Sequence, residues 1–181
     1  MHGGNIFRII EITEKDITLS ADIIRRSCKT VADQFGLTED NAPISGAFLK
    51  DDELYDGYRK GIKMFGLFDV DDLATLLNPE NPVQEVTQAG FISFDRRGDD
   101  GFYIGLLAVL PKYRNKGGGR ALMDFAKEYV RNEGGKSISI SIINENKQLV
   151  KWYEKYGFEQ KEVKIYPHLP FKVCFMKLEL L

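Results

Sequence analysis

The sequence predicts an α+β fold: a mixed, mostly antiparallel twisted sheet of about seven strands with flanking helices and a parallel central strand pair. The first observation is a series of short β-branched or apolar runs, at residues 6–12, 63–70, 86–95, 102–110, 137–143, 158–166 and 171–180. The second is that the strands before residue 111 form an antiparallel meander, with 71–84 as a long connection. The third is a helical pattern after residue 117, which makes the next strand return parallel to the central one.

Helical periodicity accounts for the intervals between the strands. A helix is predicted over residues 20–34 from apolar residues at helical spacing, namely Ile24, Cys28, Val31 and Phe35, and Gly36 ends it. A second helix begins at Asp51 and Asp52, where acids suit the positive end of the helix dipole, and Gly61 stops it. A further helix runs from Asn146 to Tyr156 and stops at a glycine.

Composition predicts one domain spanning residues 1–181 and excludes several classes of function. The chain has 43% hydrophobic and 29% charged residues, and its 25 Lys and Arg against 27 Asp and Glu give no basic field for nucleic acid. No apolar run approaches the roughly 20 residues of a membrane span, and residues 1–5 lack a signal-peptide pattern. Two cysteines and two separated histidines predict neither a disulfide framework nor a zinc cluster. We therefore expect a cytoplasmic protein without a metal.

The chain is organised around the segment 107–123, whose centre is Arg-Asn-Lys-Gly-Gly-Gly-Arg-Ala at residues 114–121. A buried strand pattern precedes these residues and a helix pattern follows them. The start of a helix offers unpaired backbone N–H groups and the positive end of its dipole. Three successive glycines from Gly117 remove the side chains that would keep a phosphate away, and Lys116 and Arg120 add positive charge. The segment therefore predicts a diphosphate cradle.

Two other glycine-rich phosphate loops fit the sequence less well. A mononucleotide P-loop needs Gly-Lys followed by Ser or Thr, which occurs nowhere in the chain. The dinucleotide fingerprint needs a third glycine where Leu122 stands and an acid about twenty residues later, where Ile142 and Ile143 lie. A glycine turn without any ligand is the remaining alternative at this point.

Two separated motifs resemble one known family. Residues 107–122 resemble the acyl-CoA motif of the GNAT superfamily of N-acetyltransferases: Arg or Gln, two residues, Gly, one residue, then Gly or Ala. Asn146, followed by a helix that bears Tyr153 and ends in Gly-Phe at 157–158, is similar to the next element of that family. The order and the spacing of the two motifs both match, and together they cover about residues 101–166.

The resemblance implies a GNAT-like fold with acetyl-CoA as cosubstrate. In the family, the loop amides hold the diphosphate at the helix start, and the central strand bulges away from its parallel neighbour. The slot so formed takes the pantetheine arm, which pairs with the strand like an added strand. The N–H near Leu107 would point at the thioester oxygen and stabilise the charge that develops there. The implied cofactor-binding residues are Leu107, Val109, Arg114, Asn115, Lys116, Gly117, Gly118, Gly119, Arg120, Ala121, Asn146 and Tyr153.

Catalytic roles also follow from the resemblance. Tyr153 matches the general acid that protonates the leaving thiolate, although packing on an apolar helix face would equally explain a tyrosine there. Asn146 is either a helix N-cap, a contact of the cofactor arm, or both. An amine with a pKa near about 10.4 must lose its proton before attack. Some members carry a glutamate at the position of Tyr103, a poor base, so we expect Asp95 or a water chain to take the proton, unless the amine arrives neutral.

The resemblance implies transfer of an acetyl group from acetyl-CoA to a primary amine by direct attack on the thioester. The acceptor stays open among small polyamines, aminoglycoside-like drugs, amino acids, and a protein N-terminus or lysine. The alternatives are a non-catalytic CoA-binding sensor and a plain interaction domain. Four acids could attract a cationic acceptor, namely Glu39, Asp40, Asp51 and Asp52, and His168 could border the acceptor cleft. A solvated position on the surface is the simpler explanation for each of them. The partner is then a small-molecule or peptide amine, without nucleic acid or membrane, and the sequence allows a homodimer.

Overall fold

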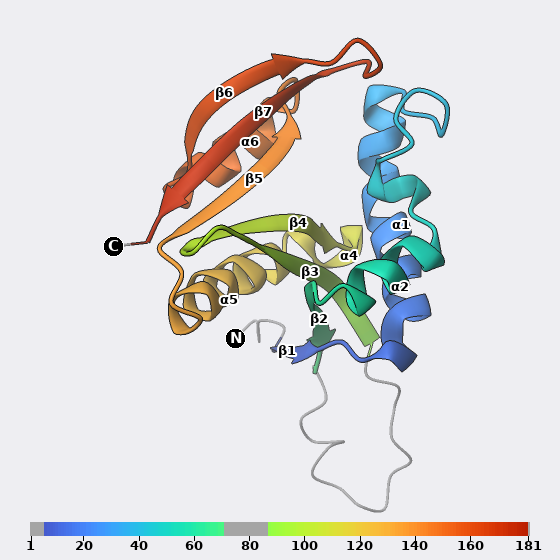
Figure 1. Ribbon diagram of the computed structural model, residues 1–181. Helices are drawn as coiled ribbons and strands as arrows, with labels where there is room; N and C mark the ends of the chain where they lie inside the picture. The colour runs from blue at the N-terminus through green and yellow to red at the C-terminus, as the bar shows by residue number, and fades with distance from the viewer. Residues whose placement is uncertain (1–5, 71–86, 181) are drawn as a thin grey trace, which may run out of the picture.

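The computed structural model describes residues 6–70 and 87–180, and within them seven strands form one sheet in the order β1-β2-β3-β4-β5-β7-β6 (Figure 1). The β4–β5 pair is parallel and the other neighbouring pairs are antiparallel. The predicted α+β sheet with a parallel central pair is therefore confirmed. The predicted 71–84 connection lies outside the described residues. The strands are β1 (Phe7–Glu11), β2 (Lys63–Asp69), β3 (Thr87–Arg97), β4 (Gly101–Val109), β5 (Ser137–Ile143), β6 (Glu159–Ile165) and β7 (Lys172–Glu179).

Helices cover both faces of this sheet. α1 (Ile17–Phe35) and α2 (Asp51–Arg59) pack on one face, while α5 (Gly118–Asn132) and α6 (Lys147–Lys155) pack on the other (Figure 1). Gly36 has a φ of 60° and ends α1, as predicted, because glycine adopts the left-handed conformation without a steric penalty. Three short elements were not predicted: the 3-10 turns Glu14–Asp16 and Gly46–Phe48, and the one-turn helix α4 (Pro111–Arg114).

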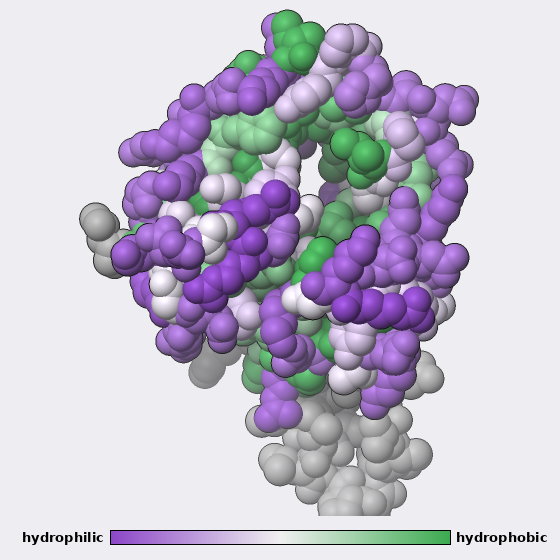
Figure 2. All heavy atoms as spheres, in the orientation of Figure 1, coloured by the Kyte–Doolittle hydropathy of each residue, from purple (hydrophilic) through white to green (hydrophobic). Residues whose placement is uncertain are grey.

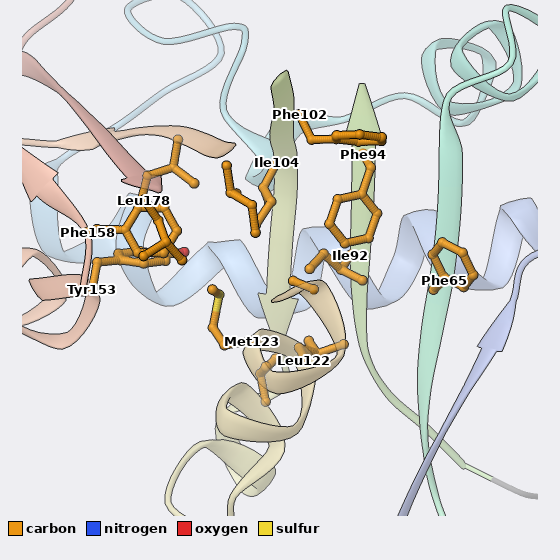
Figure 3. Packing of buried hydrophobic residues seen from close by; sticks show 14 of the residues in the cluster. Phe65, Ile92, Phe94, Phe102, Ile104, Leu122, Met123, Tyr153, Phe158 and Leu178 are labelled. Atoms are coloured by element: carbon orange, nitrogen blue, oxygen red, sulfur yellow. The ribbon is translucent and has the colours of Figure 1, made fainter. Parts of the chain in front are cut away.

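The larger hydrophobic cluster lies between the sheet and the pair α5 and α6 (Figure 3). The apolar stripe of α5 supplies four fully buried side chains, Leu122, Met123, Ala126 and Val130. Burying each of the larger ones contributes roughly 1.5–3 kcal/mol, so this stripe fixes α5 against β3 and β4. The sheet and α6 contribute the facing side chains Phe65, Ile92, Phe94, Phe102, Ile104, Tyr153, Phe158 and Leu178.

A bulge in β4 changes which residues face α5. Ser93 lies opposite Leu106 and Phe94 lies opposite Ile104, so Gly105 has no partner residue on β3. Because a bulge adds one residue, Ile104 and Leu107 both belong to the cluster on the α5 face although three positions separate them. The bulge therefore turns the end of β4 relative to its start.

Candidate active site

The strands β4 and β5 pair over three residues only, from Gly101 opposite Ser137 to Tyr103 opposite Ser139. Beyond Tyr103, β4 continues along β3 while β5 continues along β7, so the two parallel strands separate. Figure 2 shows an opening through the molecule, with hydrophobic side chains at its rim, where Figure 1 places β4, the β5–β7 strands and α1. The slot between the two strands is not closed by their own hydrogen bonds.

The backbone of β4 turns two N–H groups toward this slot. Val109 lies opposite Gly90, and the Leu110 N–H donates to the Ala89 carbonyl at 2.9 Å. Val109 and Gly90 are therefore a pair without hydrogen bonds between them, and the N–H and C=O groups of Val109 are directed away from β3. Because hydrogen-bond direction alternates along an antiparallel ladder, Leu107, two residues earlier, has the same orientation. The structure thus directs the N–H groups of Leu107 and Val109 to the side from which β5 has withdrawn.

The glycine segment begins α5 beside the end of β4. The first hydrogen bond of the helix runs from the Ala121 N–H to the Gly117 carbonyl at 2.9 Å. The N–H groups of Gly118, Gly119 and Arg120 precede it and have no carbonyl within the helix to bind. Gly117 has a φ of 90°, which favours glycine. This helix start therefore has the unpaired donors that a phosphate needs.

Close packing explains the absence of side chains in this segment. A Cβ at Gly118 would lie 3.1 Å from the Tyr113 carbonyl oxygen and 3.1 Å from a Val109 methyl group, so α5 approaches β4 closely. A Cβ at Gly119 would lie 3.3 Å from the Trp152 ring of α6. The residues present fit a diphosphate bound at this helix start, and a side chain there would have to displace its neighbours.

Two of the predicted cradle amides are used elsewhere. The Ala121 N–H is the first donor within α5, and the Lys116 N–H donates to the Tyr113 carbonyl at 3.3 Å. Of the predicted cradle 115–121, the amides of Lys116 and Ala121 are therefore bound within the protein, while those of Gly118, Gly119 and Arg120 lie at the start of α5. The reason is that α4 and α5 each form their own hydrogen bonds, which the glycine pattern alone did not show.

The Arg114 side chain also has a different place from the one predicted. Its Nε donates to the Val109 carbonyl at 3.0 Å, its Nη1 to Thr30 Oγ1 at 2.8 Å and its Nη2 to the Ser27 carbonyl at 2.6 Å. These three bonds tie the end of β4 to α1. The guanidinium therefore holds the two elements together, and its donors are not directed at the α5 helix start.

Tyr153 is buried on α6 between Trp152 and Phe158, with ring centroids 4.9 and 5.3 Å away. Figure 3 shows its hydroxyl directed from α6 toward β4. Burial raises the pKa of the phenol above its ordinary value, so the group is neutral at physiological pH and can only donate or accept a hydrogen bond there. Asn146 caps α6, as predicted: its Oδ1 accepts from the Leu149 N–H at 3.2 Å.

The structure does not bring Asp95 to Leu107. Asp95 lies opposite Tyr103, three residues along β3 from Ile92, which lies opposite Leu107. That separation is roughly 10 Å along a strand. The Asp95 carboxylate instead forms an ion pair with Arg97 at 2.8 Å. The predicted role of Asp95 as a base beside the thioester is therefore corrected on geometric grounds.

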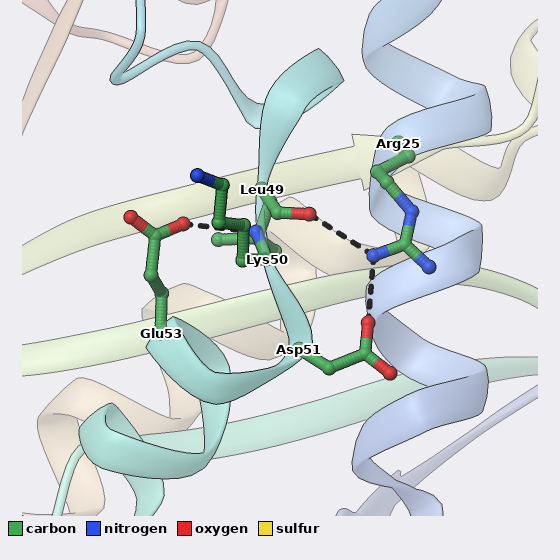
Figure 4. Close-up of polar contacts among 5 residues, drawn as sticks. All are labelled: Arg25, Leu49, Lys50, Asp51 and Glu53. Atoms are coloured by element: carbon green, nitrogen blue, oxygen red, sulfur yellow. Dashed lines mark hydrogen bonds and ion pairs between the residues drawn. The ribbon is translucent and has the colours of Figure 1, made fainter.

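Two of the four acids predicted to attract the acceptor, Asp51 and Glu39, form ion pairs within the protein. Asp51 binds Arg25 at 2.7 Å, and the hydrogen bond from Arg25 lowers the pKa of Asp51 (Figure 4). The same guanidinium nitrogen donates to the Leu49 carbonyl at 3.0 Å, so Arg25 fixes the start of α2 against α1. Glu39 lies 3.4 Å from the Lys50 amine. His168 contacts Tyr166 in the β6–β7 loop, at a ring-centroid distance of 5.9 Å.

Sequence reasoning missed two features of this region. The Tyr103 hydroxyl and Ser141 Oγ lie 2.5 Å apart and join β4 to β5 across the base of the slot. Gly105 forms the bulge, and its position inside a strand pattern is the signal that could have indicated one. The cross-strand bond had no comparable signal, because it depends on the register between β4 and β5.

The comparison with protein families decides which group this site belongs to. The model of the acetyltransferase (GNAT) family matches residues 52–158, more than half of the chain. The chain belongs to the GNAT family of acetyltransferases. The match includes β4, the glycine segment, α5 and α6, so the elements that form the slot and the helix start are the family's own.

One relative matches a part of the sequence, and two solved structures share the fold at low sequence identity. An uncharacterized N-acetyltransferase of Methanocaldococcus jannaschii is 38% identical over 55 residues, which cover 30% of this chain and 24% of that protein. The ribosomal-protein-S18-alanine N-acetyltransferase from Escherichia coli superposes with a TM-score of 0.70 at 15% identity, over 97% of this chain and 94% of that chain. The PaiA N-acetyltransferase from Thermoplasma acidophilum, in complex with coenzyme A, gives 0.69 at 16% identity, over 96% and 99%.

The described residues hold neither a membrane-spanning helix nor a cluster of metal ligands. Within residues 6–70 and 87–180, no helix is long and apolar enough to cross a membrane. Over the same part of the chain, no group of three or more His, Cys, Asp or Glu side chains is placed to hold a metal ion.

Proposed function

We propose that this GNAT protein transfers an acetyl group from acetyl-CoA to a primary amine, by direct attack of the amine on the thioester. One observation carries the proposal: β4 and β5 separate beyond Tyr103 and Ser139, and the slot between them lies beside a helix start with three unpaired amides. A diphosphate on α5 and an extended arm along β4 fit this arrangement.

Binding of acetyl-CoA uses the backbone more than the side chains. The N–H groups of Gly118, Gly119 and Arg120 donate to the diphosphate, with the positive end of the α5 dipole behind them. The Val109 N–H pairs with the arm, as in an added strand. Asn146 stays at the start of α6, with its side-chain oxygen on the Leu149 amide. These donors are fixed by the fold, so little ordering of the protein is needed on binding.

Leu107 supplies the electrostatic part of the reaction. Its N–H, turned to the slot, donates to the thioester oxygen and stabilises the negative charge that forms when the amine adds to the carbonyl carbon. Collapse of this intermediate breaks the carbon–sulfur bond and leaves the acetylated amine and the CoA thiolate. Removing a single donor of this kind typically lowers kcat by about 10²–10³.

Tyr153 acts on the leaving thiolate. Its raised phenol pKa keeps the proton on the oxygen, so Tyr153 stabilises the sulfur chiefly by donating a hydrogen bond. Because a thiol has an ordinary pKa of about 8.5, the phenol is the weaker acid, and the sulfur takes its final proton through solvent. The attacking amine loses its proton to water in the open slot, since Asp95 lies too far along β3 to receive it directly.

Release of CoA measured with a panel of amines tests the proposal. The panel includes a peptide with an N-terminal alanine, a polyamine, an aminoglycoside and free amino acids, and CoA affinity is measured in parallel. Saturable CoA binding with no turnover on any amine would favour the alternative, a non-catalytic CoA-binding sensor. Failure to bind CoA would contradict both the enzyme and the sensor, and the glycine segment would then be a turn without a ligand.

A further inference from the structure

A cavity of about 530 Å³ lies at the base of the slot, where β4 and β5 stop pairing. Tyr103 and Ser139 are the last residues that pair between the two strands, and both line the cavity. The lining residues are Arg97, Tyr103, Ser139, Ile140, Lys161, Phe175, Met176 and Lys177. The cavity thus lies roughly 10 Å along the sheet from Leu107, where the amine would meet the thioester.

The cross-strand register places two cationic side chains at this cavity. Tyr103 pairs with Ser139 and Ser139 pairs with Lys177, so these three residues form one row across β4, β5 and β7. On β6, Gln160 lies opposite Met176 and Glu162 opposite Phe175, which leaves Lys161 as the extra residue of a bulge. A bulge re-aims the side chain at its position, and here Lys161 lines the cavity.

The charge of the lining is one-sided. Arg97, Lys161 and Lys177 are cations, and none of the described residues that line the cavity is an acid. The whole chain carries a formal net charge of −2, so a generally basic surface does not explain this. Tyr103 and Ser139 add hydroxyl groups, and Phe175 adds an apolar wall. This combination suits an anionic group attached to a short apolar chain.

Each of the three cations already has an acidic neighbour, and Arg97 pairs with Asp95 at 2.8 Å, with side-chain exposures of 64% and 40%. Lys161 lies 2.5 Å from Glu159, with side-chain exposures of 46% and 74%, and Lys177 lies 2.7 Å from Glu179, with exposures of 38% and 54%. In both lysine pairs the acid is the more exposed partner, whereas Asp95 is less exposed than Arg97, and none of the three acids lines the cavity. Exposed ion pairs are worth about 0–1 kcal/mol, so they leave the lysines available to an anion inside.

We propose that this cavity binds an anionic group of the acceptor, so that the substrate is a primary amine with a carboxylate or phosphate at its other end. The proposal rests on the proposed function, because it assigns the far end of an acceptor whose amine lies near Leu107. The separation along the sheet sets the spacing between the amine and the anion at roughly 10 Å. The Phe175 side chain borders the connecting chain.

Binding of matched ligands to the CoA-saturated protein tests this assignment. The probes are 8-acetamidooctanoate, its neutral primary amide, and 6-acetamidohexyl phosphate, with affinities measured by calorimetry. A second pair, the peptides Ala-Ala-Ser-Glu and Ala-Ala-Ser-Gln as C-terminal amides, shows whether the anion can come from a peptide. We expect an anion to bind about tenfold more tightly than its neutral partner, since a charge-assisted hydrogen bond contributes about that factor.

Variants identify the cavity as the source of the preference. The double variant Lys161→Met with Lys177→Met should lose most of the preference for acid over amide, because only Arg97, which pairs with Asp95, remains among the lining cations. Lys172→Met changes an exposed residue of β7 that does not line the cavity, and it should keep the preference. Equal affinities in the unchanged protein, no binding of any probe, or an undiminished preference in the double variant would each overturn the assignment. CoA affinity and amine-dependent CoA release are measured separately. Loss of acetyl transfer would contradict the proposed function, whereas equal binding of acid and amide would contradict only the anionic acceptor.

Discussion

The Tyr103 hydroxyl lies 2.5 Å from Ser141 Oγ, two residues beyond the point where β4 and β5 stop pairing. This side-chain bond replaces the missing backbone ladder and joins the two strands at the base of the slot. The bond lies beside the cavity that Tyr103 also lines.

We expect Tyr103→Phe and Ser141→Ala to destabilise the protein by about 0.5–1.5 kcal/mol each, with little further loss in the double variant. Both single changes remove the same bond, so their effects are not additive. Urea unfolding of the four proteins gives the coupling energy. Fully additive losses would show that the two hydroxyl groups act separately in solution.

Gly119→Glu should abolish CoA binding. The new side chain places a negative charge at the helix start and meets the Trp152 ring, 3.3 Å from the Cβ position. At one hundred times its Kd, CoA should stabilise the unchanged protein by about 2.7 kcal/mol, and the variant should show none of this. Gly119→Ala separates sterics from charge, because it adds only the Cβ. Undiminished affinity in Gly119→Glu would remove the helix start from the binding site.

Tyr153→Phe should lower kcat by about 10² while CoA affinity changes little. Phenylalanine keeps the ring contacts with Trp152 and Phe158, so the loss reports the hydroxyl group. Tyr156→Phe, three residues further along the chain, serves as the matched control and should retain activity. An unchanged kcat in Tyr153→Phe would show that the hydroxyl group does not stabilise the leaving thiolate and would leave Tyr153 as a core residue.

Arg114→Lys should destabilise the protein by about 2–3 kcal/mol. A lysine cannot reproduce the three separately directed bonds to Val109, Thr30 and Ser27, and the carbonyl groups left behind lose their partner. Arg120→Lys, on an exposed side chain, is the control and should change stability by no more than about 0.5 kcal/mol. Equal stabilities of the two variants in urea unfolding would show that the Arg114 hydrogen bonds between β4 and α1 do not stabilise the protein.

The Cys28 thiol should make stability depend on pH in the alkaline range. Burial raises the pKa of Cys28 from 9.0 to about 11, with a smaller opposing effect of Arg114. The unfolded chain then loses this proton first, so the stabilisation is complete below pH 9 and is lost as pH rises toward 11. Two pKa units correspond to at most about 2.7 kcal/mol. The difference between wild type and Cys28→Ala in unfolding free energy should shrink over this interval, and a constant difference would contradict it.

Local patterns in the sequence predicted most of the elements that carry the site. The β5 strand was predicted at residues 137–143, as found, because alternating serine and isoleucine give a strand with one apolar face. The start of α5 followed from the three glycines, and the Asn146 cap from its place before a helical pattern. The one-turn helix α4 was missed, since a four-residue helix has almost no periodicity to detect.

The sequence by itself determined the order of strands and helices, the bare helix start at Gly118, and the family to which the chain belongs. Each depends on neighbours in the chain, through helical periodicity, glycine conformation and motif spacing. Only the tertiary structure decided that Arg114 binds α1, that Asp95 pairs with Arg97 away from Leu107, and that Lys161 and Lys177 line one cavity. These placements depend on strand register and bulges, which bring together residues far apart in the chain.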